Sequence, residues 1–151
     1  IVGDANYRSA FVDNVRALAD PRVRFLGHVG DRQHVQELFC SAYAYVHGHE
    51  YGGTNPSLLS ALGAGCCVLA LDTPFSREVL AGDYGLFFSK SEERLRQQLQ
   101  HIVDNPQVRA AYAQRAPQRI AAAYDWERIV DQYERILRRL TAGKRRPSGD
   151  T

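Results

Sequence analysis

The sequence of 151 residues has no methionine, one tryptophan and three cysteines, and it lacks a long uninterrupted apolar run. The longest such run, residues 66–71, is far shorter than the roughly 20 residues of a membrane-spanning helix. No charged-then-apolar signal segment opens the chain. Cys40, Cys66 and Cys67 lack the CxxC spacing of metal and redox motifs. We expect them to be small core residues of a protein in the reducing cytoplasm.

The sequence also has little excess of either charge, because 19 basic and 17 acidic residues give a net charge of only +2. Five of the basic residues lie near the end of the chain: Arg138, Arg139, Lys144, Arg145 and Arg146. Such a cluster is more typical of a solvated helix end and a disordered terminus than of a phosphate or membrane contact. We therefore expect a disordered basic tail over residues 142–151. Aromatic residues do not interleave with the basic ones, which argues against nucleic-acid binding.

The composition, 44% hydrophobic and 24% charged, is that of one soluble globular domain, which we expect over residues 1–141. Residues 1–4 have the pattern of a strand that ends in a loop, so we expect the chain to be truncated at its N-terminus. Loss of a first strand exposes a sheet edge, and an exposed edge favours self-association.

Helical and strand patterns alternate along the chain. Helices are expected over 9–19, 32–41, 56–63, 92–104, 108–124 and 126–142, with a helical turn at 77–80, and strands over 23–26, 43–46, 66–71 and 85–88. Residues 66–71 are apolar without alternation, which is typical of a parallel strand covered on both faces. The alternation predicts an α/β fold with a Rossmann-like parallel sheet flanked by helices.

Four residues carry more specific expectations. Pro117 must kink or restart the helix over 108–124. Trp126 opens an amphipathic helix, and its indole is expected to anchor that helix in the core. Arg77 and Glu78 either face a ligand or pair with each other at a helix, and the structural role is favoured.

Ligands of open α/β sheets bind beyond the carboxyl ends of the strands, which here draws attention to residues 47–57. Gly52 and Gly53 let the backbone approach a bulky anion, and the helix that follows directs its free N–H groups and positive dipole end toward the same place. Thr54 and Ser57 add hydroxyl donors. The pattern predicts a phosphate cradle, although loops that simply need positive φ angles also contain glycine pairs.

Two residues of this segment have alternative roles. Asn55 either caps the helix or contacts a ligand. His49 hydrogen-bonds a phosphate or sugar, or else stabilises the loop. His47, His49 and Glu50 suggest a metal site, but no third ligand motif accompanies them, and we expect no metal.

The whole pattern closely resembles the retaining GT-B glycosyltransferases of family 4, in particular the rhamnosyltransferase-like branch. The resemblance covers nearly the whole chain and is carried by VRFLGHV (23–29), GGTNPSLL (52–59), DTPFSREVL (72–80) and YDWE (124–127). It implies that the chain is the C-terminal, donor-binding half of such an enzyme, holding a nucleoside-diphosphate sugar without a metal or other cofactor.

The resemblance also implies positions for the donor. The residues expected to bind the nucleotide sugar are His49, Gly52, Gly53, Thr54, Asn55, Pro56, Ser57 and Ser60. The nucleobase is expected near Gly27, His28 and Val29. The family carries two glutamates separated by seven residues, which here fall on Gly52 and Ser60. Glycine is ordinary in this branch, but the hydroxyl of Ser60 cannot make the bidentate ribose contact of a carboxylate.

In the family, the acceptor domain and the basic residue that neutralises the leaving diphosphate come before the segment present here. We therefore expect an N-terminal acceptor domain as the partner, and no transfer by this chain alone. The favoured function is sugar transfer to a glycan acceptor in polysaccharide biosynthesis, with a donor such as dTDP-rhamnose, in the cytoplasm and at the inner membrane face. A degenerate, non-catalytic binding module is the alternative, and a nucleotide-sugar epimerase is a third, which the PFSREV segment disfavours.

Overall fold

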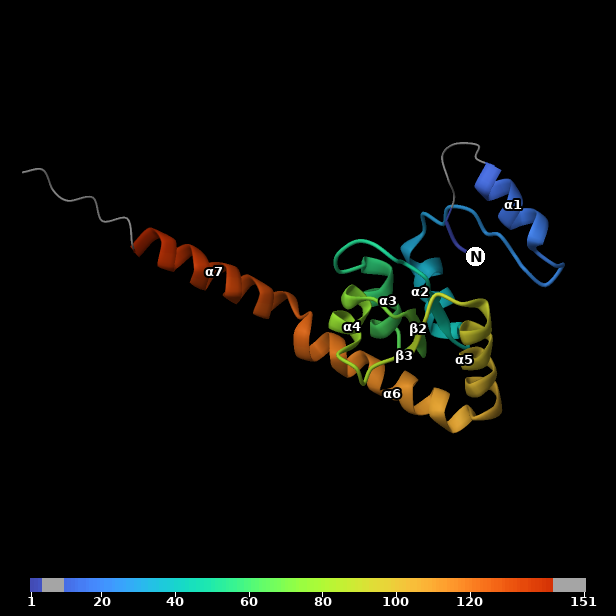
Figure 1. Cartoon of the computed structure of the whole chain (residues 1–151). Helices are drawn as coiled ribbons and strands as arrows, with labels where there is room; N and C mark the ends of the chain where they lie inside the picture. Colours follow the sequence, from blue (N-terminus) through green and yellow to red (C-terminus); the bar gives the residue numbers. More distant parts are fainter. Residues whose placement is uncertain (4–9, 143–151) are drawn as a thin grey trace, which may run out of the picture.

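The computed structural model describes residues 1–3 and 10–142 (Figure 1). Its elements are α1 (Ala10–Leu18), α2 (Arg32–Ser41), β1 (Tyr45–His47), α3 (Pro56–Gly63), β2 (Val68–Leu71), α4 (Pro74–Leu80), β3 (Leu86–Phe88), α5 (Glu92–Asp104), α6 (Pro106–Ala123) and α7 (Trp126–Ala142). Apart from Ala142, the expected basic tail lies outside the described residues. No helix in the described part of the chain has the length and apolar composition to cross a membrane.

The three strands form one parallel sheet in the order β1-β2-β3, with Tyr45 opposite Val68 and Leu69 opposite Leu86. The predicted α/β fold with a parallel sheet flanked by helices is therefore confirmed. All four residues of β2 are buried, as the uninterrupted apolar run predicts.

Successive side chains of β2 point to opposite faces of the sheet, so the strand contributes to two core clusters. Val68 and Ala70 join a cluster built from α3, α4 and α6. Leu69 and Leu71 join a second cluster with Phe88 of β3 and with α5. Helices thus cover both faces of the central strand, which leaves the carboxyl ends of the strands for ligands.

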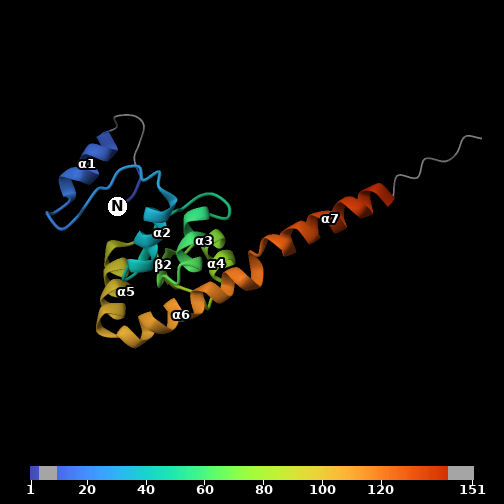
Figure 2. The same ribbon diagram turned by 180° about the vertical axis from the view of Figure 1, so that it is seen from behind.

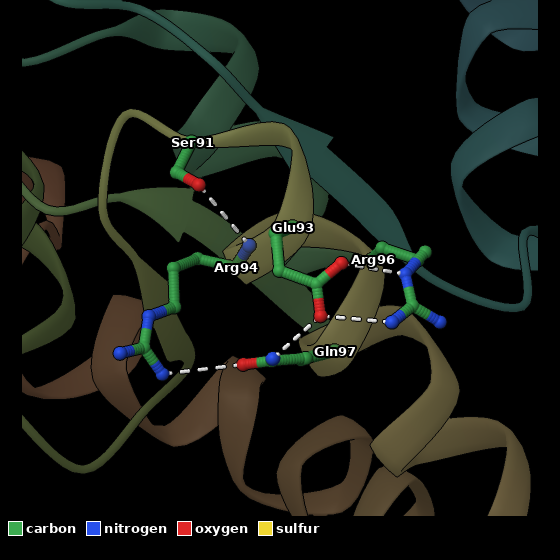
Figure 3. Close-up of polar contacts among 5 residues, drawn as sticks. All are labelled: Ser91, Glu93, Arg94, Arg96 and Gln97. Carbon is green, nitrogen blue, oxygen red and sulfur yellow. Dashed lines mark hydrogen bonds and ion pairs between the residues drawn. The ribbon is translucent and has the colours of Figure 1, made fainter.

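Four helices begin where a capping side chain stands. The side-chain oxygens of Asp31, Asn55, Thr73 and Ser91 accept backbone N–H groups in the first turns of α2, α3, α4 and α5. Figure 3 shows this cap for α5, where Ser91 faces the backbone nitrogen of Arg94 and an ion pair joins Glu93 to Arg96 one turn on. The helix starts expected at Asp31, Pro56 and Ser91 are confirmed.

Pro117 does not restart its helix, since α6 runs without interruption from Pro106 to Ala123. A proline lacks the N–H that would bond the carbonyl four residues earlier, here that of Ala113. A Cβ built on Gly65 would lie 3.5 Å from this Ala113 oxygen and 3.8 Å from the Pro117 ring. Gly65, with φ of +74°, thus lies against α6 close to Pro117, and the helix continues through the proline without that hydrogen bond.

The segment 23–26 is not a strand of the sheet, contrary to the prediction. Its backbone pairs with the first residues instead: the Ile1 nitrogen donates to the Arg24 oxygen at 2.7 Å, and the Leu26 nitrogen donates to the Ile1 oxygen at 2.9 Å. This alternation is that of a parallel ladder, but the described part of it is too short to form a regular strand.

Two expected core residues are exposed. Trp126 is 74% exposed, because α7 leaves the body of the domain and buries none of its residues (Figures 1 and 2). Cys40 is also exposed on α2, whereas Cys66 and Cys67 are buried as expected. Both errors have one cause, since apolar character predicts burial only where another element covers the residue.

Candidate functional site

The candidate site lies where β1 and β2 end and α3 and α4 begin. The loop after β1 carries the glycine pair into Asn55, which caps α3, while Asp72 and Thr73 lead from β2 into α4. Since β1 and β2 are parallel neighbours, both loops lie at the same edge of the sheet.

A shallow hollow lies at this edge, and its cavity volume is only about 10 Å³, which is room for about one water molecule. Its lining combines residues from β1 and its loop with residues of α3 and α4: His47, His49, Tyr51, Gly52, Gly53, Asn55, Leu58, Phe75, Ser76 and Val79. Four of the expected donor-binding residues thus meet in one place, namely His49, Gly52, Gly53 and Asn55.

A pair of histidines forms one side of the hollow. The rings of His47 and His49 are stacked, with centroids 5.7 Å apart and planes inclined by 17°. His47 is buried, and its Nδ1 lies 3.3 Å from the hydroxyl oxygen of Tyr45. Burial lowers the pKa of His47, and the charge of His49 lowers it further. His47 is therefore neutral, and its ring stacks against the exposed ring of His49 at the mouth of the hollow.

Asn55 acts as a helix cap, which decides between its two expected roles. Its side-chain oxygen accepts the backbone N–H of Ser57 at 2.9 Å and of Leu58 at 3.3 Å. Pro56 has no N–H. The first N–H groups of α3 are therefore already occupied or absent, and only the positive end of the helix dipole remains for an anion there.

The glycine loop supplies the backbone donors that α3 does not. Among the described residues, no partner accepts the N–H of Gly52, Gly53 or Thr54. Gly52 has φ of +127°, a conformation that L side chains rarely adopt. Gly52 and Gly53 also line the hollow beside the start of α3, so their exposed N–H groups are available to an anion there.

A second, larger groove lies on the other side of the start of α3 and has a volume of about 600 Å³, much of it open to solvent. It is lined by Val29, Gly30, Arg32, Val35, Gln36, Phe39, Pro56, Ser60, Gly63 and Ala64. The groove therefore joins Val29, expected near a nucleobase, to Ser60, expected near a ribose.

Four of the sequence-predicted residues line neither cavity. Thr54 and Ser57 are exposed near the start of α3. Gly27 has φ of +66°, and its oxygen accepts the Gly3 nitrogen at 2.8 Å. The ring of His28 lies against Gly30, whose Cβ position is 3.6 Å from the His28 Nε2. These two residues therefore shape the segment that leads to the groove.

Sequence analysis missed the contribution of α4 and of α2. Phe75, Ser76 and Val79 line the hollow, and the cation Arg32 lines the groove. For the residues of α4, the available sequence signal was the helix start at Pro74, directly after β2. For Arg32, it was the helix cap at Asp31. Sequence order alone does not say that these helix starts converge on the loop after β1.

Arg77 has a different partner from the one expected. It does not pair with Glu78 but donates two hydrogen bonds to the carboxylate of Asp72, at 2.5 and 2.7 Å. Its guanidinium also lies over the Phe87 ring, 5.0 Å from the centroid. The side chain thus ties the start of α4 to the loop after β2 and to β3, which agrees with the favoured structural role.

An ion pair spans the edge of the sheet. Lys90, just after β3, donates to the carboxylate of Glu50, in the loop after β1, at 2.7 Å. The strands concerned lie on either side of β2, so the pair links the two outer loops across the central strand. Among the described residues, no three His, Cys, Asp or Glu side chains gather as a metal site would require.

Comparisons with known proteins agree with this architecture. A sequence profile of the family described as Glycosyl transferase-like matches residues 1–135. The chain is 27% identical over 99 residues to an uncharacterized glycosyltransferase of Methanocaldococcus jannaschii, covering 64% of this chain and 25% of that protein. Sucrose-phosphate synthase from Thermosynechococcus elongatus has a similar fold, with a TM-score of 0.80 and 22% identity.

The structural match covers 95% of this chain and 38% of the sucrose-phosphate synthase chain. The chain therefore spans only a quarter to about two fifths of the length of these two proteins. At 22% identity the structural likeness concerns the fold, and it confirms the expected GT-B type of α/β architecture.

Proposed function

Because the chain belongs to the family of glycosyl transferase-like proteins, we propose that it is the C-terminal, nucleotide-sugar-binding half of a GT-B glycosyltransferase. The observation that carries this proposal is the loop of Gly52, Gly53 and Thr54, whose exposed N–H groups stand beside the start of α3. Backbone donors next to a helix N-terminus are a general solution for binding phosphate groups.

In this proposal, the two cavities bind different parts of the donor. The groove near Val29 and Ser60 has the larger volume and takes the nucleoside, while the sugar end lies over the shallow hollow beside the exposed His49. The diphosphate passes between them over Pro56, Ser57 and the glycine loop. His49 and the hydroxyls of Thr54 and Ser57 then donate to phosphate or sugar oxygens.

The proposed reaction is transfer of the sugar to a glycan acceptor in polysaccharide biosynthesis, by a member of family 4 and its rhamnosyltransferase-like branch. Retaining transfer requires charge stabilisation on the leaving diphosphate and an acceptor held over the anomeric carbon. An N-terminal acceptor domain supplies both in this proposal, so the chain alone binds the donor without transferring its sugar. We propose that it works in the cytoplasm, at the inner membrane face, without a metal or cofactor.

The second candidate is a binding module of the same fold that has lost useful donor affinity. Ser60 favours this alternative, because it faces the groove at the position where the resembling enzymes carry a ribose-binding glutamate. Its short hydroxyl makes one hydrogen bond where a carboxylate makes two.

Calorimetric titration of the chain with UDP, GDP and dTDP tests the proposal, with UMP as the matched ligand that lacks the second phosphate. Binding of one diphosphate and much weaker binding of UMP is the expected result. If none of the three diphosphates binds while circular dichroism shows a folded chain, the donor-binding proposal is wrong and the binding module is favoured.

A further inference from the structure

We propose that Arg32 selects the nucleobase of the donor, favouring bases that present a carbonyl oxygen over bases that present an amino group at the equivalent ring position. The inference rests on the proposed function, because it concerns the nucleoside end of the same donor site. Arg32 is the first residue of α2 and lines the groove that also contains Val29 and Ser60. Among the described residues that line this groove, Arg32 is the only one with a charged side chain.

The groove lies between two helices of this chain. Helices α2 and α3 are side by side in both views of the molecule (Figures 1 and 2). One face of α2 contributes Arg32, Val35, Gln36 and Phe39 to the lining. The volume of about 600 Å³ lies within the range of roughly 300 to 1,000 Å³ that is typical of sites for small organic molecules. A nucleoside therefore fits the groove by size.

Two observations favour a place for Arg32 at the nucleobase. Val29, near which the resemblance puts the base, precedes Arg32 by three residues and lines the same groove. Val29 and Val35 are also half-buried apolar side chains, which suit the flat faces of a base. The charged end of Arg32 is then available to the polar edge of that base.

The neighbouring carboxylates on α2 have other partners than Arg32. The Oδ1 atom of Asp31 accepts the backbone N–H of Gln33 at 2.9 Å, as the cap of the helix. The carboxylate of Glu37 accepts the side-chain amide of Gln33 at 3.1 Å and lies 3.8 Å from Nδ1 of His34. The guanidinium group of Arg32 therefore stands beside a groove whose described lining carries no carboxylate.

The guanidinium group donates hydrogen bonds and accepts none, and this asymmetry makes it selective. Uracil and thymine carry a carbonyl oxygen at position 4, and guanine carries one at position 6, whereas cytosine and adenine carry an amino group there. Arg32 can bond the carbonyl oxygen of the first three bases. An amino group at the same place faces a second donor, and both groups then lose hydrogen bonds that water had supplied.

Gln36 completes the recognition of the base edge. It lies four residues after Arg32, on the same face of α2, and lines the same groove. The oxygen of its amide can accept the ring N–H beside the carbonyl group, and its nitrogen can donate to the unprotonated ring nitrogen of cytosine or adenine. Gln36 therefore adds affinity for either kind of base, and Arg32 supplies the discrimination.

Calorimetry with matched pairs of nucleotides tests the inference: UDP against CDP, dTDP against dCDP, and GDP against ADP. In the pair that the chain binds, the nucleotide with the carbonyl base should bind about tenfold more tightly. Arg32→Gln should remove this preference, because an amide can serve either edge. Arg32→Glu should reverse it, because a carboxylate accepts a hydrogen bond from an amino group and repels a carbonyl oxygen.

Arg139→Gln is the matched control, since it removes the same charge from α7, which extends away from α2 in both views (Figures 1 and 2). It should leave the preference unchanged. Equal affinity for the two members of a pair, or an equal loss for both in Arg32→Gln, would overturn the inference and leave the proposed donor site intact. A folded chain that binds none of the six nucleotides would overturn the proposed function and this inference with it.

Discussion

The side-chain oxygen of Asn55 accepts the backbone N–H of Ser57 at 2.9 Å, at the point where the glycine loop becomes α3. This bond stabilises the helix start but also occupies a donor that an anion would otherwise use. The cap and the proposed diphosphate therefore compete for the same end of the helix, and substitutions at Asn55 separate stability from binding.

Asn55→Asp should keep the cap while weakening binding of a nucleoside diphosphate. Aspartate caps helices as well as asparagine does, so the melting temperature should stay within a degree or two. Its carboxylate repels the diphosphate by about 1 kcal/mol, equivalent to roughly fivefold in affinity. Asn55→Ala is the contrasting variant, because loss of the cap should cost about 1 kcal/mol of unfolding free energy. Calorimetry measures the affinity for the nucleoside diphosphate, and thermal melts measure stability. Binding by Asn55→Asp as tight as that of the native chain would contradict this account.

Gly52→Ala should impair both the loop and binding, because φ at this position is +127°. A side chain in that region costs of order 1 to 3 kcal/mol, so the loop must change conformation and move its N–H groups. Gly53→Ala is the matched control for backbone strain, since its φ is not in the left-handed region and no atom lies within 4 Å of its Cβ position. Equal melting temperatures for the two variants would show that the Gly52 conformation is not required.

Ser60→Glu should strengthen binding of UDP and GDP more than binding of dTDP. A carboxylate at the groove can accept hydrogen bonds from both ribose hydroxyls, whereas the deoxyribose of dTDP offers one. Two charge-assisted bonds in place of one are worth roughly 1.5 kcal/mol or more, about a tenfold gain in affinity. Ser60→Gln controls for side-chain size without the charge. A gain of the same size for dTDP would place the new contact away from the ribose.

Acidification should destabilise the chain through His47, whose pKa is lowered by burial and by the charge of His49. A histidine with a lowered pKa in the folded state contributes stability that is complete above its ordinary pKa of about 6.5. That contribution is lost as the pH falls from about 6.5 toward the lower pKa of the folded state. The unfolding free energy should therefore fall with decreasing pH in this range.

His47→Gln removes the titrating group and should flatten this pH dependence, even if the variant is less stable overall. Denaturant titrations at several pH values measure the slope. The same slope in His47→Gln as in the native chain would assign the effect to another group.

Loss of the ion pair between Lys90 and Glu50 should loosen the loop after β1. Hydrogen exchange of residues 48–55 is expected to be faster in Lys90→Gln, and faster in the native chain at about 1 M salt, where screening acts over about 3 Å. Arg96→Gln is the matched control, because its pair with Glu93 lies within α5. The double exchange Lys90→Glu with Glu50→Lys should restore protection, and failure to do so would show that the charge pair does not hold the loop.

Local signals in the sequence were sufficient for most of the fold. Caps and turn residues fixed the starts of α2, α3 and α5, because a side chain and the first turn of its own helix interact within four residues. The uninterrupted apolar run of β2 also involves only neighbouring residues, and it predicted a strand buried on both faces. The phosphate cradle was predicted from adjacent residues in the same way, since its glycines and its helix start are neighbours in the chain, and it stays a prediction.

Long-range packing decided the rest. Residues 23–26 have strand character, but their described hydrogen bonds go to the first residues and not to the sheet. Pro117 stays within α6, which packs closely against Gly65, 52 residues earlier in the sequence. Trp126 and Arg77 were assigned the wrong surroundings because burial and ion pairing depend on which elements are neighbours in space.

Periodicity, capping and glycine content are local properties, and they were enough to predict the class of fold, the order of its elements and the loop that we propose for an anion. Packing in three dimensions was needed to show that α4 completes the hollow, that Val29 and Ser60 share a groove, that Lys90 reaches Glu50 across β2, and that α7 buries none of its residues. The first three relationships join segments that are far apart in the chain. The exposure of α7 depends on the absence of a covering element. Local sequence patterns encode neither of these properties.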